Sequence, residues 1–114
     1  MNNGKLYVIA TPIGNLGDIT FRAVETLKTV DFIVCEDTRV TKILLDHFQI
    51  QKPFVVSNAQ TETHRIDSII KKILSGETCG LVTDAGTPGI SDPGTRLVNS
   101  AVKNDIEIIG IFCT

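Results

Sequence analysis

Residues 81–94 read LVTDAGTPGISDPG, and this stretch decides the fold class. It opens with a short apolar run, Leu81 to Thr83, which is typical of a buried strand. A loop from Asp84 to Gly94 follows and contains three glycines, two prolines and two aspartates. Apolar residues then recur at helical spacing, at Leu97, Val98, Ala101 and Val102. A strand, a loop and a helix in this order indicate an α/β unit.

The same alternation of strand and helix patterns runs through the rest of the chain. Strands are expected at residues 5–10, 32–35, 54–57, 81–83 and 106–112. The first helix is expected to begin at a cap, Asp18 or Thr20, and to carry Phe21, Val24 and Leu27 inward. A second helix is expected to open at Thr38 or Thr41 and to run through Ile43, Leu44 and Phe48.

The third helix has the clearest pattern, because isoleucines recur at helical spacing before Gly76 stops it. Its apolar positions are Ile66, Ile69, Ile70, Ile73 and Leu74. Strands that are apolar on both sides and separated by helices predict an α/β fold with an open, mainly parallel five-stranded sheet and helices on both faces. The loops that leave the strands are therefore expected to gather at the carboxyl edge of the sheet, where open α/β sheets bind ligands. These loops are 11–18, 36–39, 58–60 and 84–94.

Composition limits the possible functions. The chain has 114 residues, 42% of them hydrophobic and 21% charged, and a net charge of −2, which predicts one folded domain. Scattered lysines and arginines argue against a free-standing nucleic-acid binder, because phosphate contacts need clustered cations.

Cys35, Cys79 and Cys113 are widely spaced and odd in number, which favours reduced, buried thiols in the cytoplasm. No apolar run approaches the roughly 20 residues of a membrane helix.

The glycine-rich loop 84–94 can approach a ligand closely, and its prolines reduce the entropy lost on binding. The alternative is a long turn in which Asp92 caps the last helix and Pro93 takes its first position. The loop from Thr11 to Asp18 is similar but less specific, since it lacks both a Walker lysine and a G-x-G-x-x-G pattern. From its residues alone, a structural turn and a ligand loop are equally good interpretations.

Charged residues follow the second expected strand, in the string Glu36-Asp37-Thr38-Arg39. Adjacent carboxylates are costly to bury unless they are paired or used, so they belong at the active edge or on the surface. A helix cap at Asp37 or Thr38 with a solvated Arg39 is the alternative. His47 and His64 have no partner at metal-binding spacing and are expected to be surface or packing residues. No catalytic triad or zinc motif is present, and no metal site is expected.

Three strings together closely resemble the ribosomal RNA small-subunit methyltransferase I family, a branch of the tetrapyrrole methylase superfamily. They are Ala10 to Thr20, Glu36 to Arg39 and Asp84 to Gly94. The resemblance implies methylation of a cytidine 2′-hydroxyl, with small-subunit ribosomal RNA or the assembling subunit as partner. It also implies a homodimer of two-domain chains, in which S-adenosylmethionine lies in the cleft between the halves. Residues 1–114 would be the amino-terminal domain, with the carboxy-terminal domain absent from this chain.

The family pattern also implies which residues line the cofactor cleft. These are Pro12 on the first loop and Ala85, Gly86, Thr87, Ile90 and Ser91 on the second, with Asp84 orienting the second loop. A ribose hydroxyl is a poor nucleophile, and the loop positions offer Asp37 and Asp92 as candidate general bases. Because a cleft with one wall leaves much of a ligand in water, this chain by itself is expected to bind the cofactor weakly and to be inactive.

The sequence departs from the family pattern in two places. Ser57-Asn58-Ala59-Gln60 replaces a turn rich in His and Asn, and Gly110-Ile111-Phe112-Cys113-Thr114 replaces a Pro-Gly-Pro continuation. Two other functions remain open. One is a methylase that acts on a porphyrin-like precursor, although the string 36–39 and Thr87 favour the RNA branch. The other is a non-catalytic nucleotide-binding or dimerisation module.

Overall fold

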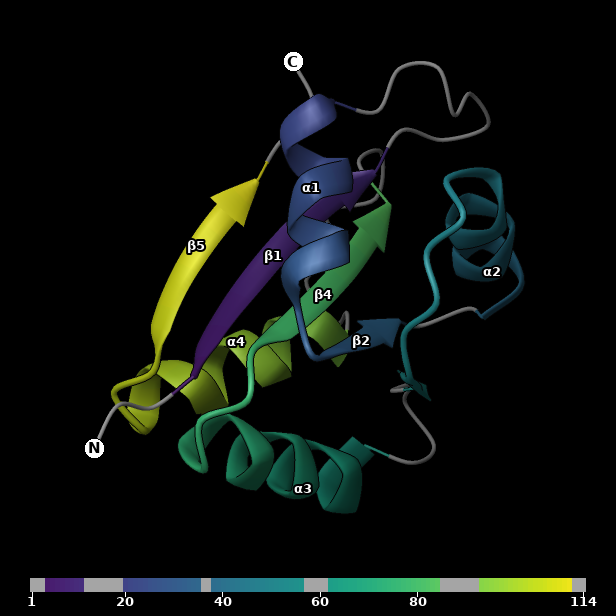
Figure 1. The fold of residues 1–114 in the computed structure, drawn as a ribbon. Helices are drawn as coiled ribbons and strands as arrows, with labels where there is room; N and C mark the ends of the chain where they lie inside the picture. Colours follow the sequence, from purple (N-terminus) through teal and green to yellow (C-terminus); the bar gives the residue numbers. More distant parts are fainter. Residues whose placement is uncertain (1–3, 12–19, 36–37, 57–61, 85–92, 112–114) are drawn as a thin grey trace.

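The computed structural model describes residues 4–11, 20–35, 38–56, 62–84 and 93–111. Within these ranges the chain alternates strictly between strand and helix (Figure 1). The elements are β1 (Lys5–Thr11), α1 (Phe21–Thr29), β2 (Phe32–Cys35), α2 (Thr38–His47), β3 (Phe54–Val56), α3 (Glu62–Leu74), β4 (Cys79–Asp84), α4 (Pro93–Lys103) and β5 (Glu107–Ile111). None of the described helices combines the length and apolar character that a bilayer-spanning segment needs.

The strands form one five-stranded sheet in the order β3-β2-β4-β1-β5. Each neighbouring pair is parallel, which confirms the predicted sheet. The two central strands, β4 and β1, are far apart in sequence but pair along their whole length, from Leu6 with Cys79 to Thr11 with Asp84. Strand β4 is therefore inserted between β1 and β2, so the glycine-rich stretch lies next to the opening strand.

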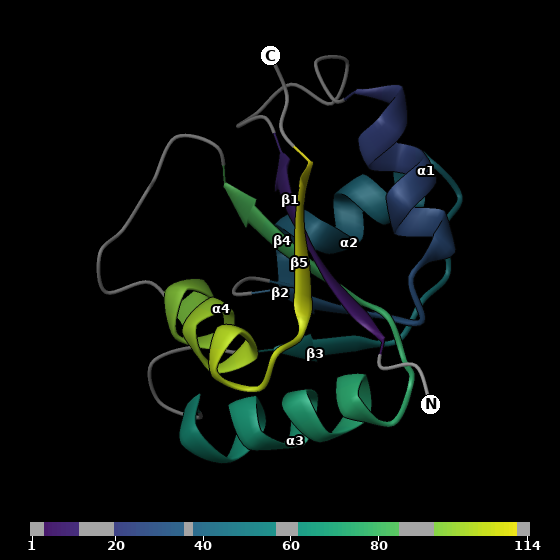
Figure 2. The same ribbon diagram turned by 90° about the vertical axis from the view of Figure 1, so that its left-hand side faces the viewer.

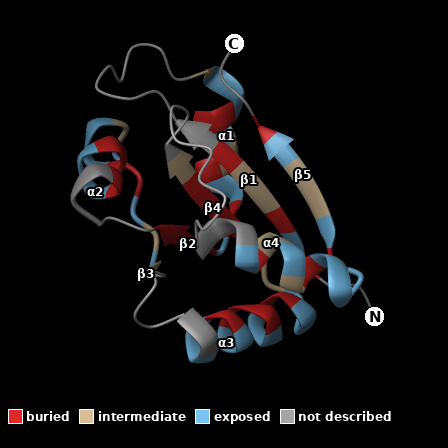
Figure 3. Cartoon of the chain, turned by 180° about the vertical axis from the view of Figure 1, so that it is seen from behind, coloured by how far each residue is buried: buried red, intermediate tan, exposed pale blue. Residues whose placement is uncertain are grey.

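The helices cover both faces of the sheet, as predicted. Helices α3 and α4 pack on one face, and α1 and α2 on the other (Figure 2). Figure 3 shows the buried side of α3 turned towards the sheet and its exposed side turned outward. The first face buries Ile66, Ile69, Ile70, Ile73, Leu97 and Ala101 against the sheet. The second buries Ala23, Val24, Leu27, Leu44 and Leu45.

Three helices end with the same hydrogen-bond pattern, in which the residue after the last turn takes a positive φ. In α3 this residue is Gly76 (φ 112°), whose amide donates to the Ile73 carbonyl (3.0 Å) while the Glu77 amide donates to Lys72 (3.1 Å). Gln49 (φ 58°) and Asp105 (φ 59°) occupy the equivalent positions after α2 and α4. This is the Schellman arrangement, which satisfies the last helical carbonyls. It confirms Gly76 as the predicted end of the third helix.

One residue predicted to lie in the core is on the surface. Phe21 was expected to face inward with Val24 and Leu27, but its side chain is 78% exposed. The helical period explains the error, because Phe21 lies on the same side of α1 as Glu25, four residues later, and Glu25 is exposed. The apolar stripe of α1 starts at Ala23, which the pattern did not include. Strand β4 also begins two residues earlier than expected, at Cys79.

The predicted burial of the cysteines is confirmed where the structure describes them. Cys35 and Cys79 are buried thiols outside any disulfide, on opposite faces of the sheet. Burial raises the pKa of the Cys79 thiol, and the nearby Lys72 ammonium lowers it by less. Cys79 therefore stays protonated at neutral pH and acts as a small core residue rather than a nucleophile. Cys113 lies outside the described residues.

Candidate functional site

The candidate site begins where β1 and β4 end. Thr11, the last residue of β1, is paired with Asp84, the last residue of β4. The segments 12–19 and 85–92 therefore start from neighbouring positions at the carboxyl edge of the sheet. The two strand ends, Thr11 and Asp84, are more than 70 positions apart in sequence. The predicted convergence of the first loop and the glycine-rich loop is confirmed at the strand ends from which they leave.

The two loops connect to helices on opposite faces of the sheet. Strand β1 leads to α1, which packs on one face, and β4 leads to α4, which packs on the other. Figure 2 shows the two helices on either side of the sheet. Adjacent parallel strands whose connections diverge in this way form a topological switch point. Open α/β sheets bind ligands in the crevice outside such strand ends.

A second pair of diverging connections lies next to the first. Cys35, the last residue of β2, pairs with Val82 of β4, and β2 leads to α2 on the face opposite α4. Strand β4 is therefore flanked on both sides by strands whose connections go to the other face. Strand β2, which precedes Asp37 in the sequence, lies on the side of β4 opposite β1. The ends of β1, β4 and β2, each followed in the sequence by a polar segment, thus lie along one edge.

The structure tests the individual site residues only in part. Asp84 ends β4 at the predicted edge. The other predicted residues, Pro12, Ala85, Gly86, Thr87, Ile90, Ser91, Asp37 and Asp92, lie outside the described residues. What the structure shows of their surroundings is the pairing of the strand ends that precede the two loops.

Each described helix begins at this edge because it follows a strand that ends there, and α1, α2 and α4 follow the three strands of the candidate site. Helix α1 is capped by Thr20, whose hydroxyl oxygen accepts a hydrogen bond from the Ala23 amide (3.1 Å). Thr20 is thus the cap, one of the two predicted candidates. Helix α2 begins at Thr38, one of the two predicted openings. Helix α4 has Pro93 as its first residue, as in the alternative interpretation of loop 84–94 as a structural turn. The positive ends of these helix dipoles face the candidate site, so the edge favours anionic or electron-rich ligand groups.

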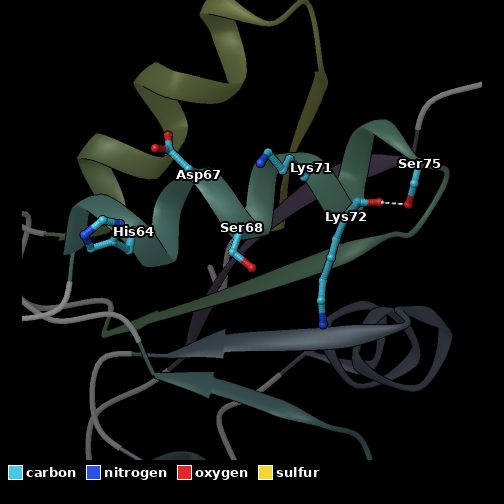
Figure 4. A pocket seen from close by; sticks show the side chains of 6 residues that line it. All are labelled: His64, Asp67, Ser68, Lys71, Lys72 and Ser75. Atoms are coloured by element: carbon cyan, nitrogen blue, oxygen red, sulfur yellow. Dashed lines mark hydrogen bonds between the residues drawn. The ribbon is translucent and has the colours of Figure 1, made fainter.

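A shallow hollow of about 490 Å³ lies elsewhere, on the outer face of α3 (Figure 4). It is lined by His64, Asp67, Ser68, Lys71, Lys72 and Ser75. Five of these residues belong to α3 and Ser75 directly follows its last residue, so one helical segment lines the hollow and the lining includes no second wall. The Lys72 ammonium lies 5.0 Å from the centre of the Phe32 ring, and its stem covers the sheet. This hollow is a feature of the helix surface.

The histidines behave as predicted. His47 and His64 are both exposed, and the His47 ring meets Phe48 edge to face at 4.8 Å. Within the described residues, no three His, Cys, Asp or Glu side chains are grouped so that they could hold a metal ion.

Comparison with known proteins agrees with this geometry. The family model of the tetrapyrrole (corrin/porphyrin) methylases matches residues 5–110. The chain is 50% identical over 104 residues to "Ribosomal RNA small subunit methyltransferase I" of Mycoplasmopsis pulmonis, covering 91% of this chain and 47% of that protein. It is 53% identical over 108 residues to the Synechocystis protein of the same name, covering 95% and 39%. The chain thus spans less than half the length of these relatives.

A solved structure shows the same fold at low sequence identity. A cobalamin synthesis related protein (CobF) from Corynebacterium diphtheriae superposes with a TM-score of 0.70 at 16% identity, over 97% of this chain and 52% of that one. This likeness concerns the arrangement of strands and helices alone. The similarity to a particular group of methyltransferases comes from the sequence relatives.

Proposed function

We propose, since this chain belongs to the tetrapyrrole (corrin/porphyrin) methylase family, that it is the amino-terminal half of a methyltransferase that acts on small-subunit ribosomal RNA. One observation carries the proposal. The chain is 50% and 53% identical, over more than nine-tenths of its length, to two proteins named ribosomal RNA small subunit methyltransferase I. Because this chain spans less than half the length of those relatives, we assign the activity to the complete product of the gene. The acceptor in this proposal is the 2′-hydroxyl of a cytidine.

The proposed cofactor is S-adenosylmethionine, which supplies a methyl group already activated on a sulfonium. Pro12 and the group Ala85, Gly86, Thr87, Ile90 and Ser91 would line its site, and Asp84 would orient the second loop. The paired ends of β1 and β4 support this assignment, because the two segments start side by side at a switch point. The described strand ends are those of a ligand crevice, and the adenosyl cofactor is our proposal for its occupant.

The chemical task of the chain is mainly to align the reacting atoms. In the proposed reaction the cofactor would supply its methyl group to the ribose 2′-oxygen and would leave as S-adenosylhomocysteine, while the residues at this edge would hold the two in line. The proton of the hydroxyl passes to a carboxylate, for which Asp37 and Asp92 are the candidates. Asp37 follows β2 and Asp92 precedes α4, so both belong to the segments around β4.

The function is tested by incubating the complete gene product with small ribosomal subunits and radiolabelled S-adenosylmethionine. Alkaline hydrolysis of RNA requires a free 2′-hydroxyl, so a 2′-O-methylated cytidine survives as an alkali-stable dinucleotide. We expect the label in that product, and none from the 114-residue chain alone. Label in a porphyrin-like precursor supplied in parallel would instead establish the tetrapyrrole alternative. Absence of transfer to either acceptor would favour the non-catalytic module.

The base assignment is tested by Asp37→Ala and Asp92→Ala in the complete gene product. Loss of a general base is expected to lower kcat by roughly 100-fold or more with little change in KM for the cofactor. Asp46→Ala is the control, since Asp46 is an exposed carboxylate of α2 near the opposite edge. If both variants at the candidate positions turn over like the wild type, neither aspartate is the base.

The proposal also includes a homodimer that works in the cytoplasm. The buried thiols of Cys35 and Cys79, which are not in a disulfide, suit a reducing compartment. Light scattering on the complete gene product measures the oligomeric state directly.

A further inference from the structure

Phe21 differs from the other aromatic residues that the structure describes. Its side chain is 78% exposed, whereas Phe32 is 1% exposed and Phe48 and Phe54 pack against the core. The other exposed large hydrophobic residues of the described ranges are aliphatic, namely Ile43, Leu74 and Val102. Phe21 therefore presents a flat aromatic surface to solvent.

The position of Phe21 is fixed by the start of α1. It is the first residue of that helix and follows the cap Thr20, whose hydrogen bond to the Ala23 amide holds the first turn. In Figures 1 and 2 this end of α1 lies on the same side of the molecule as the arrowheads of β1 and β5. Because α1 begins at the carboxyl edge, its first residue, Phe21, lies at that edge of the sheet.

The helical period shows that the ring is not a displaced core residue. The buried side of α1 carries Ala23, Val24 and Leu27. Phe21 shares its side of the helix with Glu25 and Lys28, both exposed. The helix therefore holds an apolar ring on its polar side, at the edge where the first loop joins it.

An exposed ring at this edge fits the proposed RNA substrate. Proteins bind unpaired nucleotides in part by stacking their bases on aromatic side chains. The chain has a net charge of −2 and scattered basic residues, so attraction to phosphate contributes little from this half. We infer that Phe21 stacks on a base of the RNA substrate next to the methylated nucleotide. The inference rests on the proposed function, which it extends by naming a substrate contact.

The first test distinguishes a need for a flat aromatic ring at position 21 from a need for any apolar side chain there. Phe21→Leu keeps an apolar side chain and removes the flat face, while Phe21→Trp keeps a face that stacks. Phe21→Leu is expected to lower kcat/KM for small ribosomal subunits by roughly tenfold, and Phe21→Trp to stay within about threefold of wild type. The KM for S-adenosylmethionine should be unchanged in both. Val102→Ala is the control and should behave like the wild type. Val102 is exposed and lies near the end of α4, away from the edge where the helices begin.

The second test identifies what touches the ring. The photoreactive residue 4-azidophenylalanine is placed at position 21, or at position 102 as control, in the complete gene product. We expect light-induced crosslinking to ribosomal RNA from position 21 alone. Crosslinks only within the protein, or between two copies of it, would show that the ring packs against protein and would overturn the inference.

The outcomes also separate this inference from the proposed function. If the wild type methylates RNA while Phe21→Leu matches it in kcat/KM, the inference fails and the function stands. Equal losses in Phe21→Leu and Phe21→Trp would indicate a packing role and also overturn stacking. If the wild type transfers no methyl group to RNA, the proposed function fails, and the substrate contact fails with it.

Discussion

The two edges of the sheet are built differently. At the amino edge, backbone groups of separate elements bond directly to each other: the Gly4 amide donates to the Ile73 carbonyl (2.7 Å), and the Asp31 amide donates to the Thr78 carbonyl (2.8 Å). The Asp31 carboxylate in turn accepts from the Thr78 amide (2.8 Å). At the carboxyl edge, the described residues are the ends of strands and the starts of helices. There the chain presents polar and glycine-rich segments.

This difference indicates a division of roles within one small fold. Helix ends at the amino edge are closed by positive-φ residues and hydrogen bonds, so changes there should act on stability. Paired strand ends with diverging helices at the carboxyl edge form a place for a ligand, so changes there should act on binding and turnover. The experiments on Asp37, Asp92 and Phe21 address the second edge. Three stability measurements test the comparison itself.

The largest effect is expected for Gly4→Ala. A Cβ at Gly4 would collide with the backbone carbonyl of Glu77, which has no side-chain freedom to move away. The free energy of unfolding, measured by urea denaturation, should fall by about 1–3 kcal/mol, as in other overpacked sites. Glu77→Ala is the matched control, because it removes the side chain and leaves the carbonyl in place. Wild-type stability in Gly4→Ala would show that the amino edge is not tightly packed.

A smaller effect is expected at the carboxyl edge for Thr20→Ala. This change removes the hydroxyl that accepts from the Ala23 amide and caps α1. Such a loss typically costs about 1 kcal/mol, and Thr20→Ser should restore it. Thermal denaturation monitored by circular dichroism measures both. If Thr20→Ala were as damaging as Gly4→Ala, the two edges would not differ in how they support the fold.

The smallest expected effect is a gain in stability rather than a loss. Gln49 takes a positive φ of 58° after α2, where glycine is unstrained. Gln49→Gly should raise the free energy of unfolding by roughly 0.5 kcal/mol, since relief of backbone strain is partly offset by a more flexible unfolded chain. Asp105→Gly, at the same kind of position after α4, should gain less, because aspartate tolerates this conformation better. A loss of stability in Gln49→Gly would contradict the assigned helix end.

Some features could be predicted from local patterns because a local cause decides them. The isoleucines of α3 recur at helical spacing, and Gly76 ends that helix because glycine adopts a positive φ without strain. Phe21 was predicted wrongly for the opposite reason. A large apolar residue at the start of a helix satisfies the hydrophobic pattern, but only the packed position of α1 shows which side of the first turn meets the sheet.

The sequence by itself determined the α/β class, the existence of five strands and four helices, and membership of the methylase family, because each follows from periodicity or from contiguous motifs. Only the tertiary structure decided that β4 is inserted between β1 and β2 and that Thr11 pairs with Asp84. Strand order depends on contacts between residues more than 70 positions apart, which no local pattern encodes. That long-range pairing, rather than either loop alone, brings the two segments of the candidate site to one edge.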